Sequence, residues 1–166
     1  EKGLPAIVSK RQRVNVEALD PSIKSLNYLN NILAKIEATK AGVPEAIMLN
    51  SDGHVCECTG DNVFFVKGDT IVTPPVSAGV LIGITRASVI ELIWLKTRYK
   101  LVEKLFRPQA LFDADEVFFT GTAAEVIPVT KIDGKRIGNG RPGPITLELV
   151  EHFRGLIQRE GMLARR

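Results

Sequence analysis

The sequence predicts an α+β domain with a mixed or antiparallel β-sheet. Short apolar segments rich in valine, isoleucine and phenylalanine, such as DNVFFVK and DEVFFTGT, are separated by turns that contain glycine or proline. Three longer segments carry apolar residues at helical spacing. The 166 residues, of which 45% are hydrophobic and 25% are charged, suffice for one domain with a sizeable core.

The first half of the chain is expected to contain one helix and five strands. Asp20 and Pro21 are typical of a helix start and Gly42 of a helix end, so a helix is expected over 20–42. Its apolar residues recur at helical spacing and predict one buried face: Ile23, Leu26, Leu29, Leu33 and Ile36. The expected strands are 5–16, 46–50, 54–58, 61–67 and 70–75.

The second half is expected to contain two further helices and a hairpin. A glycine-bearing loop over 77–86 leads into a helix over 85–99, with Thr85 as its N-cap. The dipeptide Asp133-Gly134 predicts a hairpin turn. The other expected elements are a strand over 100–106, a short helix or turn over 107–114, a strand over 115–122 and a helix over 143–161.

Composition argues against several classes of function. The net charge is +3, and the basic clusters SKRQR and ARR contain no aromatic residue, which disfavours nucleic acid as a partner. No apolar run reaches membrane-spanning length, and no secretory signal opens the chain. Cys56 and Cys58 are an unlikely disulfide, and with His54 and His152 they form no zinc pattern. We therefore expect no metal site and a reducing, cytoplasmic location.

Lys24 lies off the apolar face of the expected 20–42 helix, with Tyr28 one turn further along the same side. On spacing alone, this pattern favours a solvated lysine beside a partly exposed tyrosine, because lysine is rarely buried.

Two turns and one carboxylate have the composition of a ligand site. IGITRASVIEL places glycine and threonine at a helix start, where free N–H groups favour an anion. FFTGTAAE ends a strand in small residues with two hydroxyls that can donate to a phosphate or carboxylate oxygen. Each turn alone is more often an ordinary turn and cap. Glu57 lies in an apolar strand and needs a partner, either an arginine or the cationic nitrogen of a ligand.

Taken together, a lysine, a tyrosine, a carboxylate and two phosphate-binding turns are the components of a pyridoxal phosphate site. The chain resembles the branched-chain aminotransferase and D-amino-acid aminotransferase family, the fold-type IV pyridoxal phosphate enzymes. The resemblance covers Val14 to Leu156 and rests on five motifs in family order: KSLNYLNN, EAIMLNSDGHVCECTGDNVFFVKG, TPPVSAGVLIGITR, ADEVFFTGTAAEVIPV and IDGKRIGNGRPGPIT. It implies the family's large domain, with a mixed sheet or pseudo-barrel and flanking helices.

The resemblance implies a role for each matching residue. Lys24 matches the catalytic lysine, which forms a Schiff base with the cofactor and moves a proton. Tyr28 matches the tyrosine at the ring oxygen, and Glu57 the glutamate at the pyridine nitrogen. The remaining matches concern the phosphate, the substrate and the supporting backbone: Ile84, Thr85 and Thr122 at the phosphate, Thr122 and Ala123 at the substrate carboxylate, Asn62 as a support, and Gly83 and Gly121 as backbone requirements.

The sequence departs from the family in two places. The segment ECTGDN stands where branched-chain relatives often read EGAGEN or EASGEN, so Cys58 and Thr59 border the cofactor edge. The family's smaller N-terminal domain has no counterpart, and the chain lacks an initiator methionine. We therefore expect residues 1–166 to be the C-terminal cofactor-binding domain of a longer enzyme.

The resemblance implies transamination of branched-chain L-amino acids with 2-oxoglutarate as the amino acceptor. GTAAE favours this branch, because D-amino-acid relatives carry a more hydroxyl-rich turn. The alternatives are a D-amino-acid aminotransferase, an aminodeoxychorismate lyase, or a non-catalytic phosphate-binding or assembly domain. The expected partners are an amino acid, a 2-oxo acid and a second copy of the chain, as a homodimer or higher oligomer.

Overall fold

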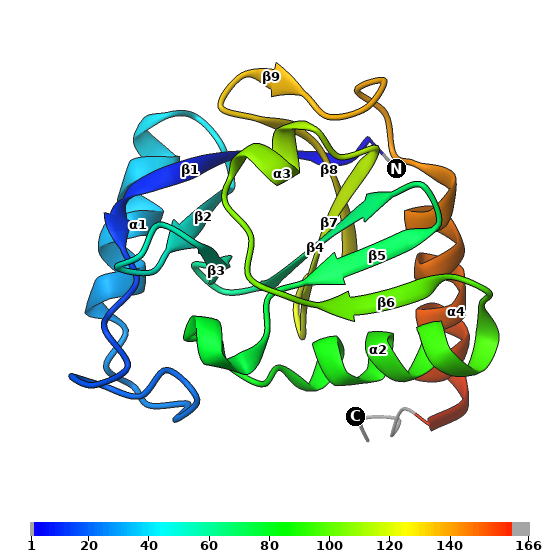
Figure 1. Ribbon diagram of the computed structural model, residues 1–166, viewed down its shortest axis with the longest axis horizontal. Coiled ribbons are helices and arrows are strands. Elements are labelled where there is room, and N and C mark those ends of the chain that lie inside the picture. Colours follow the sequence, from blue (N-terminus) through cyan, green and yellow to red (C-terminus); the bar gives the residue numbers. More distant parts are fainter. Residues whose placement is uncertain (1, 161–166) are drawn as a thin grey trace, which may run out of the picture.

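The computed structural model describes residues 2–160 and contains one curled sheet with helices on its outside (Figure 1). The helices are α1 (Leu29–Lys40), α2 (Ile84–Lys96), α3 (Gln109–Phe112) and α4 (Pro144–Glu160), with one 3-10 turn, η1 (Val76–Ala78). The strands are β1 (Leu4–Gln12), β2 (Glu45–Leu49), β3 (Val55–Cys58), β4 (Asn62–Lys67), β5 (Thr70–Thr73), β6 (Lys100–Glu103), β7 (Glu116–Gly121), β8 (Glu125–Ile132) and β9 (Lys135–Arg136).

The sheet is mixed, which confirms the predicted class. Its strand order is β3-β2-β1-β8-β7-β4-β5-β6, and β9 pairs with β8. The pairs β1–β2, β1–β8 and β5–β6 are parallel, and the others are antiparallel. The sheet curls into a half-barrel (Figure 1). Strands β3 and β4 follow each other in the chain, but β3 lies at one end of the strand order and β4 lies between β7 and β5.

Strands β4 and β7 are buried on both faces, which explains their continuous apolar sequences. Val63 and Phe65 of β4 point into a core with Phe119 of β7, whereas Phe64 points into a second core with Phe118. The rings of Phe64 and Phe118 stack with their centroids 4.9 Å apart. The middle of the sheet is therefore held by packing on both sides.

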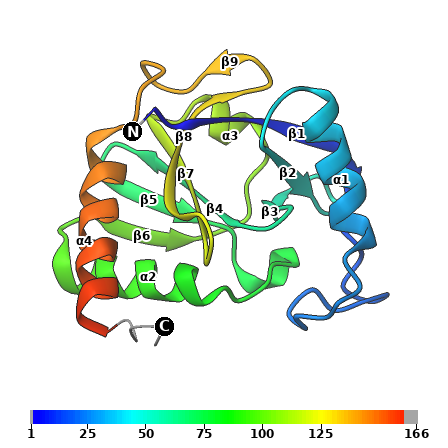
Figure 2. The same cartoon turned by 180° about the vertical axis from the view of Figure 1, so that it is seen from behind.

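Helices cover the outside of the curled sheet at its two ends. Helices α2 and α4 pack beside β4–β7, and α1 lies against β1 and β2 at the opposite end (Figures 1 and 2). On α4, the buried residues Thr146, Leu149, Val150 and Phe153 follow helical spacing. Helix α3 contributes Leu111 to the core on the inner side of the sheet.

The expected helix over 20–42 is wrong in its first half, because α1 begins only at Leu29. Asp20 accepts a hydrogen bond from the Ser22 N–H, at 2.9 Å, and caps a local turn in place of a helix. The predicted apolar face is largely exposed, and Leu26 is 101% exposed. Helix α1 instead buries its face with Asn31, Ala34 and Ala38. Apolar spacing does not form a helix where no surface is available to bury it.

The remaining predicted elements are confirmed with shifted ends, including the Asp133-Gly134 hairpin between β8 and β9. The predicted end of the last helix at residue 161 lies outside the described residues. Thr85 is not the N-cap of its helix, since Gly83 takes that position and Thr85 lies inside the first turn. Cys56 and Cys58 are free and buried. Within residues 2–160, no helix is both long and apolar enough to cross a membrane.

Candidate functional site

Two adjoining cavities lie beside β3, with volumes of about 300 and 340 Å³. They share the lining residues Lys24, Tyr28, Asn31, Glu57 and Leu81. The larger cavity extends from β3 to the start of α2 and the end of β7. Every site residue predicted from the sequence lines this larger cavity except the exposed Ala123: Lys24, Tyr28, Glu57, Asn62, Ile84, Thr85 and Thr122.

Lys24 and Tyr28 come from the irregular segment 14–28, whose polar side chains fix its turns without a helix. The Asn27 N–H donates to Ser25 Oγ at 3.3 Å, and the Val14 N–H donates to Asn30 Oδ1 at 3.0 Å. Lys24 and Tyr28 therefore reach the same cavity from a loop, and not from one face of a helix as the sequence predicts.

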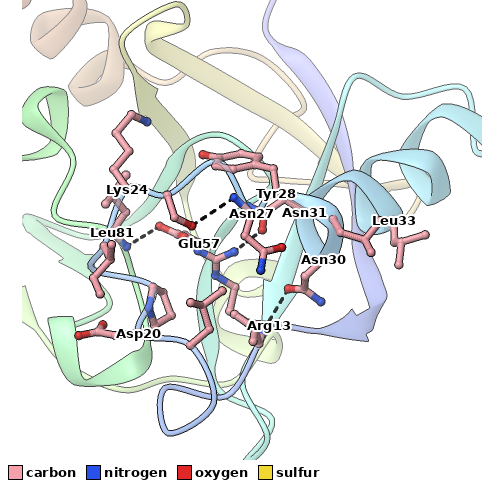
Figure 3. A pocket seen from close by; sticks show the side chains of 16 residues that line it. Arg13, Asp20, Lys24, Asn27, Tyr28, Asn30, Asn31, Leu33, Glu57 and Leu81 are labelled. Atoms are coloured by element: carbon pink, nitrogen blue, oxygen red, sulfur yellow. Dashed lines mark hydrogen bonds and ion pairs between the residues drawn. The ribbon is translucent and has the colours of Figure 1, made fainter.

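Glu57 is held in place by contacts with both of its carboxylate oxygens (Figure 3). Its Oε1 lies 2.5 Å from Arg13 Nη2, and both side chains are buried. Its Oε2 accepts from the Leu81 N–H at 2.9 Å and from Asn62 Nδ2 at 3.2 Å. Figure 3 shows Lys24 and Tyr28 on one side of Glu57 and Arg13 on the other. Glu57 therefore has the arginine partner that the sequence allows. It also lines the cavity, so the other allowed partner, a ligand nitrogen, could contact it there.

Burial raises the pKa of Glu57 to about 7, although the charge of Arg13, the Leu81 N–H and the charge of Lys24 all lower it. Removing the carboxylate from water thus outweighs its favourable contacts. Near neutral pH the group is close to its midpoint, so a cationic nitrogen in the cavity would favour its ionised form.

Asn62 connects Glu57 to the start of α2. Its Nδ2 donates to the Leu81 carbonyl at 3.0 Å as well as to Glu57. Its Oδ1 lies so close to Gly83 that a Cβ there would be 2.3 Å from it. The close approach of the Asn62 side chain therefore explains the glycine at position 83, where the sequence also predicts a backbone requirement. The backbone conformation does not explain it, because a φ of −67° suits any residue.

The start of α2 presents unpaired donors to the larger cavity. The Ala87 N–H makes a backbone hydrogen bond to the Gly83 carbonyl at 2.9 Å, so helical geometry leaves the preceding N–H groups of Ile84, Thr85 and Arg86 without partners inside the helix. Ile84 and Thr85 line the cavity. The positive end of the helix dipole adds to an environment that favours an anion.

A second glycine turn lies opposite, where β7 ends. A Cβ on Gly121 would lie 1.9 Å from Asp61 Oδ1, so a larger residue here would force the Asp61 side chain to move. Burial and the charge of Glu45 raise the pKa of Asp61 to about 6. Thr122 follows Gly121, is exposed, and lines the cavity. The two turns that the sequence predicts therefore border the same space.

Two residues of the site were not assigned from the sequence. The sequence predicts Arg13 only as part of a strand. The need of Glu57 for an arginine partner was a signal that could have identified Arg13 as a site residue. Thr120 belongs to the hydroxyl pair of Thr-Gly-Thr, but only Thr122 received a role. Within residues 2–160, no group of three His, Cys, Asp or Glu side chains could hold a metal ion.

The chain is similar to known proteins in sequence and fold. The family described as Amino-transferase class IV matches residues 1–132. A "Probable branched-chain-amino-acid aminotransferase" of Aquifex aeolicus is 44% identical over 163 residues, covering 95% of this chain and 52% of the relative. The branched-chain-amino-acid aminotransferase of Pseudomonas aeruginosa is 45% identical over 130 residues, covering 78% of this chain and 42% of the relative.

A crystal structure of the branched-chain amino acid aminotransferase from Thermobaculum terrenum, in its PLP-form, superposes with a TM-score of 0.90 at 38% identity. The match covers 93% of this chain and 51% of that one, so the chain spans about half the length of the relatives it matches. The family match covers most of the sequence. The chain therefore belongs to the class IV aminotransferase family.

Proposed function

We propose that the protein is a pyridoxal phosphate-dependent aminotransferase that acts on branched-chain L-amino acids, with 2-oxoglutarate as the amino acceptor. The observation that carries this proposal is that Lys24, Tyr28 and Glu57 line the same 340 Å³ cavity as the two turns with anion-binding character. In this reading, residues 1–166 form the cofactor-binding domain of a longer enzyme.

The donor set of the larger cavity fits pyridoxal phosphate. One end of the cavity has the N–H groups of α2 and the hydroxyl of Thr85, which suit a phosphate. The other end has Glu57, which suits a protonated pyridine nitrogen. Thr120 adds a buried hydroxyl without a hydrogen-bond partner. Lys24 is the one cation among the described residues that line this cavity.

Each residue would have one task. When bound, pyridoxal phosphate supplies an aldehyde carbon and an electron-withdrawing ring. Lys24 would hold the aldehyde carbon as a Schiff base and, once displaced, carry a proton on its Nζ. Tyr28 would donate to the ring oxygen, and Glu57 would keep the ring nitrogen protonated. Ile84, Thr85 and Thr122 would hold the phosphate, with Thr122 and Ala123 near the substrate carboxylate and Asn62 supporting Glu57.

The relatives' names favour the branched-chain substrates over the D-amino-acid and lyase alternatives. A substrate panel tests this choice. We expect the 166-residue chain, or a protein of the relatives' length that contains it, to convert L-leucine, L-isoleucine and L-valine with 2-oxoglutarate. Conversion of D-alanine without conversion of L-leucine would contradict the substrate assignment.

We also propose a homodimer, because the segment before and within α1 exposes apolar side chains beside the site. Ile23, Leu26 and Leu29 are 61%, 101% and 62% exposed. A patch of this kind is typical of an interface. We expect sedimentation velocity to give a dimer and Leu26→Glu to shift it toward monomer, with Lys40→Glu, at the far end of α1, as a control. A wild-type monomer would contradict this proposal.

The free cysteines Cys56 and Cys58 favour a reducing, cytoplasmic location.

A further inference from the structure

The hydroxyl of Thr120 has no hydrogen-bond partner in the part of the chain that the structure describes, although the residue is only 1% exposed. Burying a hydroxyl without a partner costs free energy, and native proteins rarely leave one unpaired without a reason. Two other buried threonine hydroxyls are paired: Thr73 donates to the Val63 carbonyl at 2.9 Å, and Thr146 donates to Glu116 at 2.7 Å. Thr120 differs from them in lining the larger cavity.

The place of Thr120 in the sheet indicates which part of the cavity it serves. It pairs with Asn62 across β4 and β7, so the two side chains emerge from the sheet side by side. Asn62 in turn contacts Gly83, at the start of α2. Thr120 is also the last residue of β7 before Gly121, and Thr122 lies in the turn that follows. Thr120 therefore lies at the end of the cavity where α2 and the Thr122 turn meet.

Several donors gather at this end of the cavity. They are the N–H groups of the first turn of α2 and the hydroxyls of Thr85 and Thr122. A ligand with several acceptor oxygens would pair with all of them at once, and a phosphate carries three such oxygens. A neutral ring atom would satisfy at most one.

We propose that Thr120 is a further phosphate-binding residue, and that its hydroxyl donates to the phosphate of the cofactor from the floor of the cavity. This inference rests on the proposed function, because it takes the ligand to be pyridoxal phosphate. It gives a reason for the free-energy cost of this hydroxyl, which has no hydrogen-bond partner among residues 2–160.

The test uses Thr120→Val, which keeps the shape of the side chain and removes its hydroxyl. Dissociation constants are measured by absorbance titration with pyridoxal phosphate and with pyridoxal, which lacks the phosphate. We expect the valine variant to bind pyridoxal phosphate about tenfold more weakly. Its affinity for pyridoxal is expected to stay unchanged, and Thr120→Ser, which retains a hydroxyl, is expected to keep most of the affinity for pyridoxal phosphate.

Thermal unfolding without ligand separates this role from a structural one. Thr120→Val is expected to leave Tm unchanged or to raise it, because it removes a hydroxyl that has no partner. The matched control Thr73→Val removes a paired hydroxyl outside the cavity, and we expect it to lower Tm by about 5 °C without changing the affinity for pyridoxal phosphate.

The outcomes that overturn the inference are distinct from those that overturn the proposed function. Equal binding of pyridoxal phosphate by wild type and Thr120→Val, or an equal loss for pyridoxal, overturns the assignment of Thr120 to the phosphate alone. A loss of Tm in Thr120→Val comparable with that in Thr73→Val indicates a structural hydroxyl and also overturns it. If the wild-type protein does not bind pyridoxal phosphate, the proposed function fails and this inference fails with it.

Discussion

Replacing Lys24 by alanine is expected to abolish transamination, with a loss in kcat of at least about 10⁴-fold. Lys24 carries the one amine among the described residues of the larger cavity that can form a Schiff base with an aldehyde, and it is also the proton carrier in the proposed mechanism. Steady-state rates with L-leucine measure the loss. Lys24→Arg should fail equally, because arginine keeps the charge and provides no nucleophilic amine.

The fold should not change in either variant. Lys24 is exposed in the irregular segment 14–28, so we expect the free energy of unfolding to remain within about 0.5 kcal/mol of wild type. Lys40→Ala is the matched control, since Lys40 is an exposed lysine at the end of α1 outside both cavities. Retention of most of the activity in Lys24→Ala would show that another group does the chemistry.

Replacing Glu57 by glutamine is expected to lower kcat by on the order of a hundredfold or more. The amide keeps the shape and can still accept from the Leu81 N–H, but it carries no charge to hold a proton on a ring nitrogen. The variant also leaves Arg13 buried beside a neutral group. The absorption spectrum of the bound cofactor separates an electronic effect from lost binding, because a change at the ring nitrogen alters the spectrum of protein that remains saturated. An unchanged spectrum with full activity would contradict the role of Glu57.

The raised pKa of Glu57 also predicts how stability without ligand depends on pH. The folded form keeps its proton up to about pH 7, whereas a solvated glutamate loses it near 4.5. The contribution of Glu57 to stability is therefore fully present below pH 4.5 and is lost as pH rises toward 7. Asp61, with its pKa raised to about 6, acts in the same direction. Denaturant titrations across this range should give a shallower pH dependence for Glu57→Gln than for wild type, and equal slopes would contradict the prediction.

The strands were predictable from sequence because their signals, apolar runs and flanking turns, are local. The apolar runs of β4 and β7 are buried on both faces, and tight turns mark their ends. The segment 20–28 was not predictable in the same way. Its helical spacing of apolar residues is real, but the described part of the chain offers Ile23 and Leu26 no surface, and Asp20 caps a local turn.

The site was predictable where chemistry depends on residue type and motif, as at Lys24, Glu57 and the two glycine turns. The contacts between distant segments were not. Arg13 reaches Glu57 from the end of β1, and Thr120 pairs with Asn62 across β4 and β7. Neither contact produces a local sequence pattern, because each depends on the order and register of the strands.

The most direct test of the central claim is the attachment of pyridoxal phosphate to Lys24. The protein is mixed with pyridoxal phosphate, its visible absorption is recorded, and the complex is reduced with borohydride and mapped by peptide mass spectrometry. We predict an absorption band shifted from that of free pyridoxal phosphate and a single major modified peptide carrying the cofactor mass on Lys24. Modification spread over surface lysines, or no band with the 166-residue chain or with a protein of the relatives' length, would contradict the claim that Lys24 is the catalytic lysine.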